Sequence, residues 1–109
     1  MIFDRINFMS EKALRMGIDV GSTTVKILIL GSLDSENPDK NEIIYTHYER
    51  HHAEQWNTTQ RLLKAVEEKF PGCRFRIAVC GSGGKPIADK IGAHFVQEAV
   101  ANSSAVRAL

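Results

Sequence analysis

The residues with the clearest chemical potential lie in the segment 17–26, which reads GIDVGSTTVK. Two apolar runs are separated here by an acid, a glycine and three hydroxyl residues, namely Asp19, Gly21, Ser22, Thr23 and Thr24. Hydroxyl and backbone N–H groups in such a turn can form a concavity that binds a phosphate. Glycine lets the backbone approach the anion and permits a positive φ, and the acid is placed to orient a hydrated Mg²⁺. The segment predicts a phosphate-binding hairpin, with an ordinary polar hairpin turn as the alternative.

A second glycine-rich turn spans residues 80–86, with the sequence CGSGGKP. It is not a P-loop, because the required first glycine is missing and Pro86 occupies the place of the required Ser or Thr. A glycine-rich turn from a strand into a helix still directs backbone N–H groups and the positive helix end toward one point. We therefore expect Gly81 and Gly83 to line the ligand cleft, with a purely structural turn as the alternative.

The histidines and cysteines give weaker signals. No carboxylate or cysteine stands at metal-ligand spacing from His47, His51 and His52, so we expect solvated side chains near the end of a strand. Cys73 and Cys80 lack the spacing of a disulfide scaffold or a metal site, so we expect two reduced, buried thiols.

Apolar periodicity predicts the elements that position these turns. Strands are expected over Arg15–Val20, Val25–Leu30, Glu42–Glu49 and Arg74–Cys80, helices over Ala53–Phe70, Pro86–Ile91 and Glu98–Leu109, and a short extended piece over His94–Val96. The first three strands form an antiparallel meander. The long helix carries an apolar stripe, including Trp56 and Phe70, and makes a crossover that places the fourth strand parallel to its neighbour.

Length and composition predict one α/β domain. The 109 residues are 43% hydrophobic and 25% charged, and the net charge of +1 gives no reason to expect nucleic acid or an anionic membrane as a partner. No apolar run approaches the roughly 18 residues that cross a bilayer. Charged residues interrupt any signal-peptide core in residues 1–15. We expect a cytoplasmic protein with a leader over 1–15 and a folded lobe over 16–109.

The βββαβα order, the segment 17–26 and the Gly-Ser-Gly-Gly turn together resemble the first lobe of an actin-like, ribonuclease H-like ATPase domain. Within that superfamily the chain is similar to the ATPase activators of 2-hydroxyacyl-CoA dehydratases and benzoyl-CoA reductases, the BadF/BadG/BcrA/BcrD type. The segments Tyr48–His51 and Phe95–Ala101 resemble the larger CoA-substrate-specific enzyme activases of that type. The resemblance covers about residues 16–109.

The resemblance implies ATP hydrolysis coupled to electron transfer into a dehydratase or reductase component, with a [4Fe-4S] cluster shared between two activator subunits. It implies that Asp19 orients Mg²⁺ and water as the catalytic residue, and that residues 21–24 contact the phosphates of ATP. The family's cluster cysteines and second phosphate loop lie in its second lobe, so no cluster ligand is assigned to Cys73 or Cys80. We expect a truncated first lobe that binds nucleotide weakly and is inactive alone.

Two other functions remain open at this stage. One is a lobe of a sugar or acyl kinase of the same superfamily, and the other is a non-catalytic actin-like interaction module. A parent reading frame that continues past Leu109 into a phosphate loop and two cysteines would favour the activator. Continuation without the cysteines would favour the kinase, and a true stop would favour the interaction module.

Overall fold

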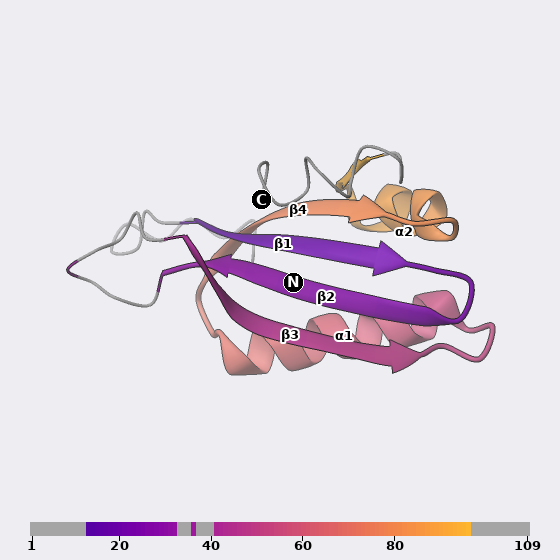
Figure 1. Cartoon of the computed structure of the whole chain (residues 1–109), viewed down its shortest axis with the longest axis horizontal. Coiled ribbons are helices and arrows are strands. Elements are labelled where there is room, and N and C mark those ends of the chain that lie inside the picture. Colours follow the sequence, from indigo (N-terminus) through magenta and orange to yellow (C-terminus); the bar gives the residue numbers. More distant parts are fainter. Residues whose placement is uncertain (1–12, 33–35, 37–40, 97–109) are drawn as a thin grey trace.

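A single mixed sheet organises the chain (Figure 1). The computed structural model describes residues 13–32, 36 and 41–96. Its elements are β1 (Ala13–Val20), β2 (Thr24–Gly31), β3 (Glu42–Arg50), α1 (Gln55–Lys69), β4 (Arg74–Cys80), α2 (Gly84–Ile91) and β5 (His94–Phe95).

The five strands are ordered β3-β2-β1-β4-β5. The first three form an antiparallel meander, whereas β4 pairs parallel to β1 and β5 pairs parallel to β4. Helix α1 provides the crossover between the meander and β4, as the sequence predicted. The predicted α/β class is confirmed, with the antiparallel meander and the parallel fourth strand that the sequence predicted.

Strand alternation gives the sheet one apolar face, which both helices cover. The aligned pairs Ile18↔Ile27 and Ile18↔Val79 show how neighbouring strands place their apolar side chains on that face. Phe70, at the end of α1, packs edge-on against Tyr45 of β3 and Phe75 of β4, with ring centroids 5.8 and 6.4 Å apart. The buried core consists of Leu14, Met16, Ile18, Val20, Val25, Ile27, Ile29, Leu62, Leu63, Val66, Phe70, Phe75, Val79, Ile87 and Ala88.

The opposite face of the sheet carries the intervening side chains of each strand. Asp19 lies on this face, between Lys26 of β2 and Cys80 of β4 in the strand register. No helix within residues 13–32 and 41–96 covers this face, so Asp19 remains partly exposed at its edge.

Element boundaries differ slightly from the predicted ones. Strand β1 begins at Ala13, two residues before Arg15, and α2 begins at Gly84, before Pro86. Helix α1 begins at Gln55 because His52 and Ala53 adopt positive φ values of 49° and 65°, which end the strand in a tight turn rather than a helix. Helix α2 ends as predicted, with Gly92 in the left-handed region at its C-terminal cap.

Two further predictions are settled by burial. Phe70 lies in the core and Trp56 packs partly buried against it, as expected. Cys73 and Cys80 are half-buried rather than buried, and they are not joined in a disulfide.

The predicted helix Glu98–Leu109 and residues 1–12 of the predicted leader lie outside the described residues. None of the described helices is long and apolar enough to cross a membrane.

Candidate phosphate-binding site

Three chain connections meet at one end of the sheet. The hairpin between β1 and β2 lies there, with the β3–α1 connection on one side of it and the β4–α2 connection on the other (Figure 1). This convergence follows from the topology. Strands β1 and β4 are parallel and end at the same edge of the sheet, and β3, which is antiparallel to β2, runs in the same direction as β1 and ends there too. The structure therefore brings the two glycine-rich segments of the sequence together.

The β4–α2 connection packs directly against the end of β1. The backbone N–H of Gly83 donates to the carbonyl oxygen of Val20 at 2.9 Å. A Cβ placed on Gly81 would lie 2.5 Å from Asp19 Oδ1 and would also overlap the backbone of Val20, and the φ of Gly81 is +96°. Gly81 is thus required both by its backbone conformation and by the closeness of the Asp19 carboxylate.

The hairpin turn leaves several donors available. Gly21 N–H donates to the Thr24 carbonyl at 2.8 Å and closes the turn, while the side chains of Ser22 and Thr23 are exposed. Within the described part of the chain, no turn hydrogen bond uses the backbone N–H of Ser22 or Thr23. These two residues can therefore offer both N–H and hydroxyl groups to an anion.

Gly21 has an ordinary backbone conformation. Its φ is not positive, and a Cβ there would lie 3.5 Å from the Thr24 carbonyl oxygen, an ordinary contact. The turn does not use the positive φ that glycine permits, because Gly21 continues the strand direction of β1 opposite Thr24. The tight, left-handed position belongs to Gly81 instead.

His51 is the residue of this region that the sequence argument missed. It is 3% exposed rather than solvated. Its Nε2 lies 2.9 Å from the Gly21 carbonyl oxygen, and Ala53 N–H donates to its Nδ1 at 3.0 Å. Since Nδ1 accepts, Nε2 carries the proton and donates to Gly21.

The backbone reinforces this link between His51 and the hairpin. His51 N–H donates to the Thr23 carbonyl at 2.9 Å. No local pattern marks His51 for burial, because its partners lie far along the chain. The only signal was its place in Tyr48–His51, a segment that carried the family resemblance.

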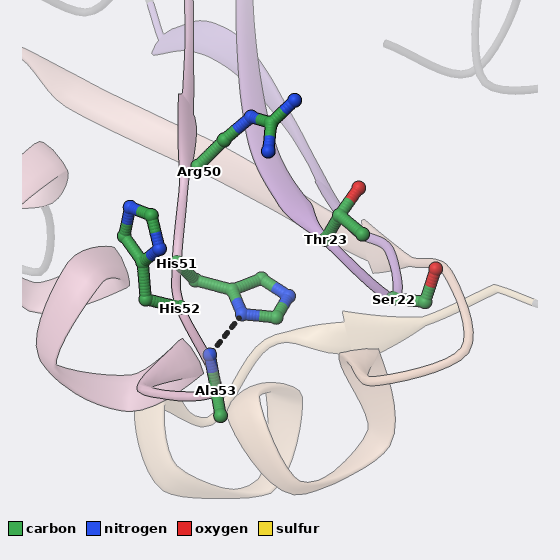
Figure 2. Close-up of a pocket in the computed structure, with 6 residues that line it drawn as sticks. All are labelled: Ser22, Thr23, Arg50, His51, His52 and Ala53. Carbon is green, nitrogen blue, oxygen red and sulfur yellow. Dashed lines mark hydrogen bonds between the residues drawn. The ribbon is translucent and has the colours of Figure 1, made fainter.

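A pocket of about 200 Å³ lies between the hairpin and the β3–α1 connection (Figure 2). Six residues line it: Ser22, Thr23, Arg50, His51, His52 and Ala53. This pocket is separate from the contact between Asp19 and Gly81, which lies on the β4 side of the hairpin.

The charges beside the pocket are arranged on opposite faces of β3. Glu49 points to the helix-covered face, where it forms an ion pair with Arg61 of α1. The hydrogen bond from Arg61, followed by that from His47, lowers the pKa of the Glu49 carboxyl. Glu49 therefore stays ionised and paired with Arg61 of α1, so it does not neutralise the charge of Arg50 on the other face.

The site fits Mg²⁺ but not an iron–sulfur cluster. Asp19 offers one partly exposed carboxylate beside a cradle that any Cβ at Gly81 would fill, which suits a cation that keeps most of its waters. No group of three or more metal-binding side chains occurs among the described residues. Cys73 immediately precedes β4 and Cys80 is its last residue. At roughly 3.3 Å per strand residue the two cysteines lie about 23 Å apart along the strand, so they cannot share a cluster.

Comparisons with known proteins give only distant structural similarity. No protein-family model and no curated protein matches the chain. A Ppx/GppA family protein from Aquifex aeolicus aligns with a TM-score of 0.46 and 16% identity, over 84% of this chain and 40% of that one. An exopolyphosphatase from Cytophaga hutchinsonii aligns with a TM-score of 0.48 and 13% identity, over 79% of this chain and 35% of that one. The chain thus spans two fifths or less of these structures, and similarity this low assigns it neither a family nor an activity.

Proposed function

We propose that this chain is the first phosphate-binding lobe of an actin-like ATPase and that its hairpin binds the phosphates of Mg·ATP. The observation that carries the proposal is the position of Asp19, whose carboxylate lies against Gly81 where two glycine-rich turns meet. A carboxylate beside exposed hydroxyl and N–H donors is the combination needed to hold a hydrated cation and a phosphate together.

Each residue of the site has a defined role in this proposal. Ser22 and Thr23 donate hydrogen bonds to phosphate oxygens through their backbone N–H and hydroxyl groups. Asp19 accepts hydrogen bonds from water molecules of the hydrated Mg²⁺ and holds the attacking water in place. Mg²⁺, when bound, neutralises charge that develops on the phosphate oxygens.

The two glycines of the β4–α2 connection act by shape. Gly81 leaves room for the Asp19 carboxylate, and Gly83 uses its N–H to hold the carbonyl of Val20. Gly21 provides a side-chain-free surface that the ligand can approach, and Thr24 closes the turn.

For the whole protein we propose an ATPase activator that drives electron transfer into an acyl-CoA dehydratase or reductase. The resemblance of residues 17–26 and 48–51 to the activators supports this assignment. The dehydratase or reductase component and a second activator subunit would be its partners. The [4Fe-4S] cluster would be held outside this chain, because Cys73 and Cys80 do not fit it. The proposed phosphate binding does not involve the cluster.

Titration of the purified chain with Mg·ATP and Mg·ADP, followed by amide chemical shifts, tests the lobe assignment. We expect shifts concentrated in residues 21–24 and 81–84, even at millimolar affinity. Asp19→Asn should remove the dependence on Mg²⁺. Asp89→Asn is the matched control, because Asp89 is an exposed acid that pairs with Lys85 at 2.8 Å on α2. Shifts that are absent, or that occur away from both turns, would overturn the assignment.

A further inference from the structure

The pocket beside the β3–α1 connection contains a charge that the proposed function does not use. Arg50 lines this pocket together with Ser22 and Thr23 (Figure 2). Arg50 pairs with Thr24 in the β2/β3 register, so its side chain lies beside the first residue of β2 after the hairpin turn. The side chains of Arg50 and Thr23 therefore lie near one another on the β3 side of the hairpin, and Ser22 lines the pocket further along the turn (Figure 2).

Arg50 has no counter-ion in the part of the chain that the structure describes. It takes part in none of the ion pairs or side-chain hydrogen bonds of residues 13–32 and 41–96. The preceding carboxylate, Glu49, is held by Arg61 on the opposite face of the sheet. None of the six lining residues is acidic. A guanidinium without a counter-ion in this pocket is suited to binding an oxyanion, to which it can donate through two parallel N–H groups.

The size of the pocket limits what it can hold. At about 200 Å³ it is smaller than the clefts of roughly 300–1,000 Å³ that take complete drug-sized ligands. It has room for one phosphate group and a few waters. His51 is not available as a ligand contact, because both of its ring nitrogens are engaged with backbone groups.

We propose that this pocket binds one phosphate group of a polyphosphate chain, with Arg50 as its charged contact. The proposal rests on the proposed function, since the hairpin then contacts the neighbouring phosphate of the same ligand. The ligand class is a linear triphosphate, either a nucleoside triphosphate or inorganic tripolyphosphate. A nucleoside monophosphate can fill only one of the two positions at a time, so it depends less on Arg50 than a triphosphate that spans both.

Calorimetric titration of the chain with Mg·ATP, magnesium tripolyphosphate and AMP tests the proposal. Arg50→Gln should weaken the binding of both triphosphates by about tenfold or more, because a charge-assisted hydrogen-bonded contact is lost. AMP binding should weaken less than triphosphate binding. Arg50→Lys should fall between the wild type and Arg50→Gln, since it keeps the charge but loses the planar fork.

Arg76→Gln is the matched control. Arg76 is exposed on the same sheet face, but it lies four residues before Cys80 on β4, about 13 Å from the hairpin end of the sheet. Its substitution removes the same charge and should leave triphosphate binding unchanged. An equal loss in Arg50→Gln and Arg76→Gln would overturn the proposal by showing a general charge effect.

The outcomes separate this proposal from the proposed function. Triphosphate binding that depends on Mg²⁺ in the wild type, loses this dependence in Asp19→Asn and is unchanged in Arg50→Gln overturns the pocket alone. Binding that needs Arg50 but is indifferent to Mg²⁺ and Asp19→Asn supports the pocket and overturns the Mg·ATP assignment. A wild-type chain that binds no triphosphate overturns both.

Discussion

His51 Nε2 lies 2.9 Å from the carbonyl oxygen of Gly21, which precedes it by 30 residues. This hydrogen bond ties the hairpin turn to the connection that leads into α1. Together with the bond from His51 N–H to the Thr23 carbonyl, it holds the hairpin from the β3 side. Gly83 holds the same hairpin from the β4 side through Val20. The turn that presents Ser22 and Thr23 is therefore fixed before any ligand binds.

His51→Ala should destabilise the fold by about 1–3 kcal/mol, because it leaves the partly buried Gly21 carbonyl without its donor. His51→Gln should recover part of this loss, since its amide can donate. The free energy of unfolding from urea denaturation measures the effect. His52→Ala is the control: His52 is the adjacent exposed residue, and its substitution should change stability by no more than about 0.5 kcal/mol. Equal losses in the two alanine variants would contradict the link.

Gly81→Ala should destabilise the protein more than Gly72→Ala. Both glycines have positive φ, +96° and +79°, so both substitutions strain the backbone by about 1 kcal/mol or more. Only at Gly81 does the new Cβ also overlap Val20 and the Asp19 carboxylate, whereas nothing lies within 4 Å at Gly72. Thermal denaturation of the two variants compares the effects, and equal midpoints would show that the contact at Gly81 relaxes freely.

Gly21→Val should remove nucleotide binding and leave a folded protein. A Cβ at Gly21 meets only Thr24 atoms, the nearest at 3.5 Å, so the fold has room for it. The added branch would occupy the surface that a phosphate must approach. Amide spectra check folding, and Mg·ATP titration checks binding. Wild-type affinity in this variant would exclude the hairpin as the phosphate site.

The Glu49–Arg61 ion pair should make stability depend on pH. Since Arg61 lowers the pKa of Glu49 in the folded protein, the contribution is fully present above the unfolded carboxyl value of 4.5 and is lost as pH falls through the folded value. Wild type should exceed Glu49→Gln in urea midpoint at pH 7, and the difference should shrink toward pH 3 and in high salt. Glu68→Gln, at an exposed position of α1, should show no such difference.

Local patterns in the sequence determined most of the fold. The period-2 runs around the hairpin predicted β1 and β2, and the stripe from Trp56 to Phe70 predicted α1, because side-chain burial repeats with the geometry of each element. The crossover rule then predicted that β4 would be parallel to its neighbour. Residue types alone also identified the hairpin at Asp19 and the turn at Gly81 as candidate sites.

Only the tertiary structure decided how those candidates meet. Two relationships depend on how distant parts of the chain pack together: the overlap that a Cβ on Gly81 would make with Asp19, and the burial of His51 against Gly21. Such relationships depend on register and strand order, which act between residues distant in the chain. The burial of His51 was mispredicted for this reason, because a residue's own neighbours do not specify what packs against it from another strand.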